Sequence, residues 1–314
     1  MAMDFWEAQR KARLRTTLYL ILFVLLTVAT AAAAEVILRS FESENYNPPL
    51  PIVGLTFLGL TFAVAAFNYL MYRSQGGSYV AESIGAKRID INTNNPAERQ
   101  LVNIVQEIAL ATSLPVPAIY IIPSGEINAF AAGLTPQNAA IAITAGALER
   151  LNRDEIQGVI AHEFGHIYNA DMVIGLRLAA MVMGFFFVLY IGLRLMQGAS
   201  FRRSGGERQG GINIILIAAL LLMVAGAFAW FMGSLLKATV SRQREYLADA
   251  SSVQYTRNPQ GLINALKKIA NDKYRDMPKT GSAYSHMYLE DHASFFATHP
   301  PIEKRIEAIE GQSI

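Results

Sequence analysis

Four long apolar stretches place the strongest limit on how this chain can fold. They cover about residues 17–38, 50–72, 172–196 and 212–236 of the 314. A helix needs about 20 apolar residues to cross a bilayer, and each stretch is about that long or longer. A soluble core helix would explain one such stretch, but four of them favour a membrane protein. Hydrophobic residues make up 52% of the chain, more than is usual in soluble domains, which supports the same conclusion.

The first apolar stretch has an alternative interpretation as a cleaved signal peptide. Small residues end it, and four basic residues precede it: Arg10, Lys11, Arg13 and Arg15. A signal sequence has an apolar core of about 7–15 residues, and this stretch is longer. We therefore interpret it as a membrane span.

The basic residues beside the spans predict the side of the membrane on which each loop lies. The basic N-terminus should stay in the cytoplasm, whereas the loop 39–49 carries one arginine and should lie outside. Residues 73–171 and 237–314 are then cytoplasmic. The loop between the third and fourth spans opposes this topology, because it carries three arginines: Arg202, Arg203 and Arg208.

We therefore expect four parts. Residues 1–72 form an N-terminal transmembrane hairpin, and residues 172–236 form a second one. Residues 73–171 and 237–314 are the two parts of one extramembrane domain. The fold class is a mainly α membrane protein with about four transmembrane helices and an α+β extramembrane domain.

The first extramembrane part mixes helix and strand patterns. Residues 97–112 carry apolar residues at helical spacing, with Asn95 as a possible cap and Pro96 at the first helical position. The segments PAIYIIP, INAFAAG and AAIAIT are bounded by proline or turn residues and predict strands. The segment AGALERLNRDEIQGVIAHEFGHIYNAD predicts helix, turn and helix, with Asn152 or Asp154 capping the second helix.

The second extramembrane part is mostly helical. The segments SRQREYLADASSVQYTRN and PQGLINALKKIANDKY predict two helices, and PPIEKRIEAIEG predicts a short last helix. Residues 276–298 have a mixed pattern and predict loops.

The charge gives no indication of a nucleic-acid partner, and the cysteine content excludes cysteine-based sites. The net charge of +2 is too small to indicate a nucleic-acid partner. Cysteine is absent, which excludes disulfides and thiolate metal sites. Any metal must therefore be bound by histidine, aspartate or glutamate.

The segment HEFGH is an H-E-x-x-H motif in a stretch that otherwise predicts an apolar helix. His162 and His166 are two of only five histidines in the chain. Residues four apart on a helix are about 40° apart in projection and about 6 Å apart along the axis, so both imidazoles can bind one zinc ion. Glu163 is placed to reach a water beside that ion but not to replace a histidine.

A catalytic zinc ion needs a third protein ligand and an open position. The segment SRQREYLADASS offers Glu245 and Asp249, which share one face of a predicted helix. One carboxylate can bind zinc while the other accepts the second N–H of a ligand histidine. Alternatively, Glu245 is a solvated charge that pairs with Arg242 or another nearby basic residue.

These segments together resemble the HtpX-type membrane zinc endopeptidases, which are relatives of the CaaX prenyl proteases. HEFGHIYNADM, followed after a hydrophobic hairpin by SRQREYLADA, carries the resemblance, and INAFAAG, ITAGALERL and THPPIEKRIEAI occur in the family's order. The resemblance extends from about residue 80 to the end. It implies a cytoplasmic zinc protease domain of the gluzincin type with one zinc ion per chain.

The resemblance also implies a role for each residue of the motif. The zinc ligands are His162, His166 and Glu245, and Glu163 is the catalytic base. Asp249 is implied as a partner that orients His162.

The carbonyl oxygen of the substrate gains negative charge during peptide hydrolysis and needs a donor besides zinc. The resemblance places a histidine near the site, and His299 is the candidate. Alternatively, His299 is a loop histidine held by the two prolines that follow it. We interpret His286 and His292 as loop histidines.

The segment NAFAAG is the candidate for binding an extended substrate by adding it to a sheet edge. It is short, consists mainly of small residues and is flanked by a turn, and its candidate residues are Asn128, Ala129 and Phe130. Alternatively, it is a core strand.

We therefore expect an integral membrane protein of the plasma (inner) membrane, if bacterial, that cleaves polypeptides at the cytoplasmic face. The resemblance implies misfolded or damaged membrane proteins as substrates. A processing protease for lipidated C-termini is a second hypothesis, and a membrane scaffold with structural zinc is a third. Glu163 argues against the scaffold, because a structural site needs no base and is usually closed by four ligands.

Overall fold

A computed structural model describes residues 5–41, 46–202, 212–273 and 300–311. The chain divides into two compact units. The helical unit contains residues 1–69 and 177–236, and the sheet unit contains residues 70–176 and 237–314.

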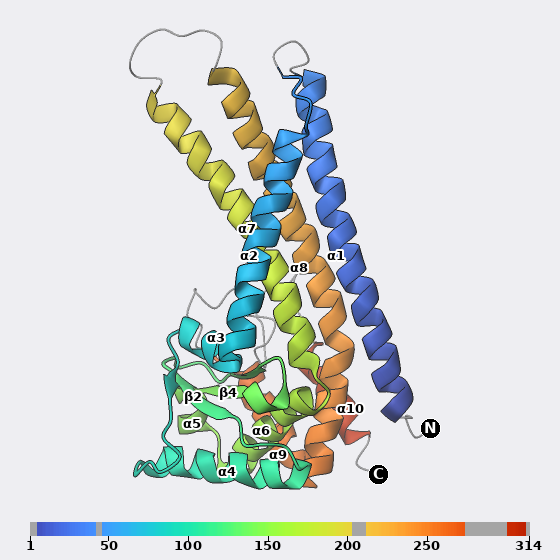
Figure 1. Ribbon diagram of the computed structural model, residues 1–314. Helices are drawn as coiled ribbons and strands as arrows, with labels where there is room; N and C mark the ends of the chain where they lie inside the picture. Colours follow the sequence, from blue (N-terminus) through green and yellow to red (C-terminus); the bar gives the residue numbers. More distant parts are fainter. Residues whose placement is uncertain (1–4, 42–45, 203–211, 274–299, 312–314) are drawn as a thin grey trace. The chain divides into compact units, whose positions relative to one another are not determined.

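Long helices build the helical unit (Figure 1). They are α1 (Phe5–Phe41), α2 (Ile52–Gln75), α7 (Asp171–Arg202) and α8 (Ile212–Thr256), of which the last three continue into the sheet unit. Each contains a segment long and apolar enough to cross a membrane: Ile21–Ser40, Ile52–Gln75, Asp171–Gln197 and Leu216–Ser234. The four spans predicted from the sequence are therefore confirmed as helices of sufficient length and apolarity, and the chain is an integral membrane protein.

Glycines allow the long helices to approach one another closely. A Cβ atom on Gly184 would lie 2.6 Å from the backbone oxygen of Thr61, so α7 and α2 are in backbone contact there. A Cβ atom on Gly226 would lie 2.5 Å from the backbone nitrogen of Leu189, which brings α8 equally close to α7. Small residues at such crossings are typical of helix packing in membranes, where burial of apolar surface gives little driving force.

Large apolar side chains remain exposed on the outer surface of the helical unit. Phe67 is 59% exposed, Phe186 55% and Val224 53%. Apolar exposure of this kind along each span is what contact with lipid requires.

A buried carboxylate joins the first two long helices. Glu35 of α1 accepts hydrogen bonds from the backbone N–H groups of Val53 (2.9 Å) and Gly54 (3.2 Å) in the first turn of α2. Arg39 pairs with the other carboxylate oxygen at 2.8 Å. Glu35 thus satisfies backbone donors that a helix start leaves without a partner.

A four-stranded sheet forms the centre of the sheet unit. Its strands are β1 (Lys87–Arg88), β2 (Ala118–Ile122), β3 (Ala129–Ala132) and β4 (Ala140–Thr144), in the order β1-β2-β4-β3. β2 and β4 are parallel, and the two outer pairings are antiparallel. The three strands predicted from the sequence are confirmed, and β3 lies at one edge of the sheet.

Short helices surround the sheet. They are α3 (Gly77–Ser83), α4 (Pro96–Thr112), α5 (Ala145–Arg150), α6 (Arg153–Tyr168), α9 (Pro259–Ala270) and α10 (Ile302–Glu310), with a 3₁₀ turn at Pro136–Asn138. α6 packs against α4, α9 and β3, so the helix that carries the H-E-x-x-H motif lies in the core of the unit. The loops predicted at 276–298 lie outside the described residues.

Two of the predicted helix starts are confirmed with their caps. The Asn95 side chain accepts from the N–H of Ala97 at 3.0 Å, and Pro96 is the first residue of α4. Asn152 and Glu155 form a reciprocal capping box at the start of α6, with bonds of 2.9 and 2.8 Å. Because these bonds satisfy N–H groups that have no partner within the helix, they fix where α6 begins.

Candidate metal centre

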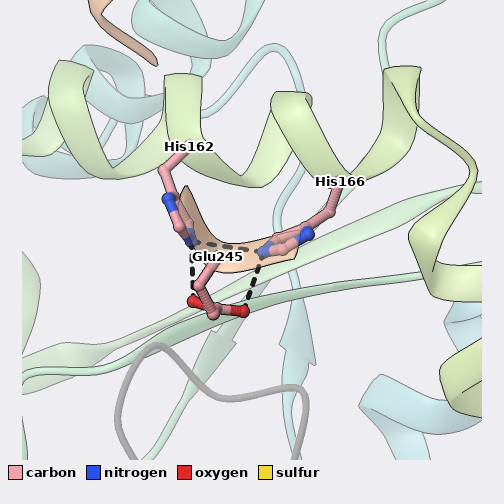
Figure 2. Close-up of side chains that lie close together, drawn as sticks. All are labelled: His162, His166 and Glu245. Carbon is pink, nitrogen blue, oxygen red and sulfur yellow. Dashed lines mark hydrogen bonds and ion pairs between the residues drawn. The ribbon is translucent and has the colours of Figure 1, made fainter. Parts of the chain in front are cut away.

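The H-E-x-x-H motif lies in the last half of α6 and points into the protein. His162 and Glu163 are each 1% exposed, and His166 is partly buried. The Nε2 atoms of the two histidines lie 3.2 Å apart, as the four-residue spacing on a helix predicts (Figure 2).

Glu245 reaches the two histidines from α8, about 80 residues further along the chain. Its Oε2 atom lies 3.6 Å from Nε2 of His162, and its Oε1 atom lies 3.5 Å from Nε2 of His166 (Figure 2). Figure 2 shows both imidazoles and the carboxylate pointing at one another.

Close packing of α8 on α6 positions Glu245. A Cβ atom on Gly165 would lie 3.0 Å from Cα of Ala248, and Ser252 donates to the carbonyl of Gly158 at 2.7 Å. These contacts lie within two turns of Glu245 and leave little freedom for the relative position of the two helices.

The three side chains fit a tetrahedral metal site. Zinc binds nitrogen and oxygen at about 2.0–2.2 Å, so neighbouring ligand atoms lie about 3.3–3.5 Å apart in a tetrahedron. The two Nε2 atoms lie 3.2 Å apart, and Glu245 presents one oxygen to each of them, Oε1 at 3.5 Å from His166 and Oε2 at 3.6 Å from His162. Two imidazoles and one carboxylate leave a fourth position open, which is the ligand set of a catalytic rather than a structural site.

Asp249 and Arg305 support His162 from the side opposite the metal position. Oδ1 of Asp249 lies 2.9 Å from Nδ1 of His162, close enough to accept its proton and so direct Nε2 toward a metal. Arg305 of α10 is fully buried and donates to both Asp249 oxygens at 2.7 and 2.9 Å. Its guanidinium also lies 3.6 Å from Oε2 of Glu245.

The Asp249–Arg305 pair holds both groups in their charged forms. Burial acts to raise the pKa of Asp249, but the charge of Arg305 and the bond with His162 lower it below its usual value. Burial acts to lower the pKa of Arg305, but Asp249 and Glu245 raise it. The two charges therefore stabilise each other in a water-poor environment.

Asp171 and Arg244 support His166 in the same manner. Asp171 is the first residue of α7, and its Oδ2 atom lies 3.5 Å from Nδ1 of His166. Arg244 lies 3.4 Å from Oδ1 of Asp171 and is largely buried. Arg244 therefore pairs with Asp171. The side chain of Arg242 lies outside the described residues.

The pKa values of the two histidines shift in opposite directions. Burial lowers the pKa of His162. Burial also acts to lower the pKa of His166, but its hydrogen bond with Asp171 and the charges of Glu245 and Glu163 raise it to about 9. Without metal, His166 can therefore hold a proton and donate it from Nε2 to Nε2 of His162, at the position where a metal would bind.

Glu163 lies beside the three clustered side chains without being one of them. Burial raises its pKa to about 7, although the charge of His166 opposes this shift. The backbone N–H of Ala131 in β3 is a hydrogen-bond partner of its carboxylate. Its Oε2 atom has no hydrogen-bond partner among the described residues. A buried carboxylate with a pKa near neutrality is suited to accept and return a proton.

The structure places the remaining sequence candidates as follows. Asn128 precedes β3, and Ala129 and Phe130 lie within it, with all three side chains buried. His299, together with His286 and His292, lies outside the described residues.

Two supporting residues were missed by the sequence reasoning. Asp171 was identifiable only by its position, five residues after His166 and at the start of the next helix. Arg305 had a clearer signal, because it shares the buried face of α10 with Ile302 and Ile309. A charged residue at an apolar position of an amphipathic helix indicates a buried partner.

A metal-binding helix pair within a protein that also carries four candidate spans defines a class, the membrane metallopeptidases. Comparison with known proteins gives the family. The model of peptidase family M48 matches residues 95–313. The chain belongs to this family, and the zinc metallopeptidase activity expected from its sequence is the activity of the family.

Curated relatives identify the chain more closely as an HtpX homologue. A protease HtpX homologue of Streptococcus uberis is 34% identical over 306 residues, which cover 94% of this chain and 96% of the relative. A homologue from Caldanaerobacter subterraneus is 34% identical and is matched over 98% of both chains. A homologue from Streptococcus equi subsp. equi is 37% identical over 265 residues, which cover 82% of this chain and 86% of the relative.

A solved structure is also similar. The crystal structure of Ste24p from S. mikatae matches with a TM-score of 0.47 and 17% identity, over 90% of this chain and 66% of that chain.

Proposed function

We propose that the chain is an endopeptidase whose single zinc ion is bound by His162, His166 and Glu245, with Glu163 as the catalytic base. The observation that carries this proposal is the convergence of three ligand side chains, two of them buried and one partly buried, beside a separate buried carboxylate. Zinc bound there would polarise the scissile carbonyl and lower the pKa of a water molecule.

Residues of the chain carry out proton transfer, orient the zinc ligands and stabilise the carbonyl oxygen. Glu163 takes a proton from the attacking water and passes it to the leaving amine. Asp249 and Asp171 orient the two histidines through their Nδ1 atoms. His299 remains our candidate for a donor to the carbonyl oxygen.

The substrate is an extended polypeptide that pairs with the free edge of β3. The N–H of Thr144 bonds to the carbonyl of Asn128, so Asn128 faces β4. Backbone groups alternate in direction along an antiparallel strand, and those of Ala129 and Ala131 therefore face away from β4. The contact between Ala131 and Glu163 supports the free edge as the route of the substrate past the base.

Among the three residues first named for substrate binding, Ala129 is thus the one whose peptide group faces the free edge. The side-chain oxygen of Asn128 already accepts the N–H of Ala129 at 3.0 Å, so the carbonyl of Ala129 is the group that we propose pairs with the substrate. The peptide group of Phe130, two residues after Asn128, faces β4 and not the free edge. We therefore assign the buried Phe130 side chain to the packing of the strand.

Membrane proteins with unfolded segments are the substrates we propose, cleaved at the cytoplasmic face of the plasma (inner) membrane if the source is bacterial. The four candidate spans support this proposal, because an enzyme held in the bilayer meets other membrane proteins there. The charge bias around the first span supports the cytoplasmic orientation.

Digestion of an unfolded membrane protein by the full chain in detergent tests the proposal. We expect cleavage by the zinc-loaded protein, loss of cleavage with a chelator, and recovery on addition of zinc. Glu163→Gln should keep its zinc and lose about 10²–10⁴-fold in rate, the usual contribution of a general base. Cleavage by this variant at the wild-type rate would show that Glu163 is not the base.

A further inference from the structure

A buried aspartate closes one end of the free edge of β3. Asp272 follows the C-terminus of α9, and its Oδ2 atom accepts the N–H of Ile127 at 2.7 Å. Ile127 lies two residues before Ala129, so its N–H faces the same free edge. A peptide that pairs with the carbonyls of Ala129 and Ala131 therefore cannot also pair with the N–H of Ile127.

Arg150 holds this aspartate in place. Its Nη1 and Nη2 atoms donate to the two oxygens of Asp272 at 2.7 and 2.9 Å. Arg150 also donates to the carbonyls of Gly125 and Gly146. Both oxygens of Asp272 are thus engaged, and its negative charge is balanced by the guanidinium.

A cavity of about 540 Å³ lies at this closed end. Ile127, Arg150 and Asp272 line it together with the lysines at the end of α9 and just beyond: Lys267, Lys268 and Lys273. Its volume is within the range of sites that bind small groups. We call this cavity the basic pocket.

Among the described residues, two cations of the basic pocket have no balancing carboxylate. Lys268 pairs with Glu155 at 2.7 Å, and Arg150 pairs with Asp272. Lys267 and Lys273 are exposed, and neither has an ion pair within the part of the chain that the structure describes. The pocket therefore has a positive charge available for an anionic group.

We propose that the basic pocket is a subsite for a carboxylate of the peptide substrate, a few residues to the C-terminal side of the scissile bond. The proposal rests on the proposed function, because it takes the free edge of β3 as the substrate route. Ile127 and Ala131 are separated by four residues, about 13 Å at the rise of a strand.

The polarity of the peptide follows from the direction of β3. The strand runs from Ile127 toward Ala131, where Glu163 contacts it. Antiparallel pairing is the more stable arrangement per residue. A peptide antiparallel to β3 runs from Glu163 toward Ile127, so its residues after the scissile bond meet the basic pocket about four positions on.

The carboxylate could come from an acidic side chain or from the C-terminus of the peptide. Matched peptides separate these sources. One series has an amidated C-terminus and carries Glu or Gln at positions two to six after the scissile bond, which is located by mass spectrometry. A second series ends at these positions with a free carboxylate or an amide.

The full zinc-loaded chain in detergent should cleave the carboxylate peptide with the lower KM. One exposed ion pair corresponds to about a two- to fivefold difference, and the preference should peak near the fourth position. Lys267→Gln/Lys273→Gln should abolish the preference for the carboxylate peptide. Lys87→Gln, on β1 at the opposite edge of the sheet, is the matched control and should retain the preference.

Binding of the same peptides to Glu163→Gln by fluorescence anisotropy gives a readout that does not need catalysis. Equal binding and equal KM for Glu and Gln peptides would overturn the basic pocket as a subsite, while metal-dependent cleavage of both would leave the proposed function intact. A preference that survives in the double lysine variant would also overturn it. Absence of all cleavage together with a Glu preference in binding would contradict the proposed function and support the pocket.

Discussion

Arg305 and Asp249 form a buried ion pair with two bonds, at 2.7 and 2.9 Å, directly behind His162. Arg305 comes from the last helix of the chain, and Asp249 comes from the end of α8. The C-terminal helix is thereby part of the support for the metal centre.

Removing Arg305 should destabilise the protein, because Asp249 would keep a buried and uncompensated charge. We expect Arg305→Met to lower the free energy of unfolding by about 3–5 kcal/mol. Chemical unfolding in detergent measures this change. Lys304→Met, at an exposed position of the same helix, should have little effect.

A double variant separates the effect of the uncompensated charge on stability from the effect of lost packing. Arg305→Met/Asp249→Leu should recover most of the stability, because an apolar pair of similar volume often replaces a buried ion pair without cost. It should still bind zinc about 10–100-fold more weakly, as should Asp249→Ala, because His162 loses its partner. Unchanged zinc affinity in both variants would contradict the role of Asp249.

Asp171 should matter for zinc binding although it is not a ligand. Asp171→Ala frees the Nδ1 side of His166, and we expect about 10–100-fold weaker zinc binding. Arg244→Ala should have a smaller effect in the same direction, because it acts through Asp171. Competition with a chromophoric chelator measures the zinc affinity of both variants, and Arg153→Ala, at the exposed start of the helix that carries His166, is the control.

Zinc binding should depend on pH through His166. Its pKa is raised to about 9, so its imidazole carries a proton at pH 7, and zinc needs the neutral form. Raising the pH removes this proton, and the zinc affinity should rise by about tenfold per pH unit and level off near pH 9. Asp171→Asn removes a group that raises this pKa, so its plateau should begin at lower pH. A profile that is flat from pH 6 to 9 would contradict the assignment.

The orientation in the membrane can be tested by labelling, because the chain has no cysteine of its own. Ser83 is exposed in α3, on the part of the chain that we expect in the cytoplasm. Ser83→Cys should resist an impermeant thiol reagent in intact cells and react after the membrane is opened. Reaction in intact cells would place residues 73–171 outside.

The sequence was most informative where the signal is local. The four spans follow from uninterrupted apolar length, and the His162–His166 geometry follows from the four-residue helical spacing. Asn95 and Asn152 were predictable as caps because capping depends on residues within one turn. The approach of Glu245 to the histidines was suggested by family resemblance, since no local rule connects side chains about 80 residues apart.

The tertiary partners were less predictable. Arg244 had no local signal that it pairs with Asp171, and only the packing of α8 shows it. The partner of Arg305 was also not predictable from local sequence. Its position between Ile302 and Ile309 on the apolar face of α10 nevertheless indicates that Arg305 is buried. The closure of the β3 edge by Asp272 required knowledge of the strand pairing, because the direction of the Ile127 N–H follows from the register with β4.

Zinc content per chain, measured in parallel for the wild type, Glu163→Gln and Glu245→Ala, tests the metal centre most directly. We predict one zinc ion per chain in the wild type and in Glu163→Gln, and a large loss in Glu245→Ala, because two histidines alone leave the site without its third ligand. Full zinc occupancy together with full activity in Glu245→Ala would contradict the site.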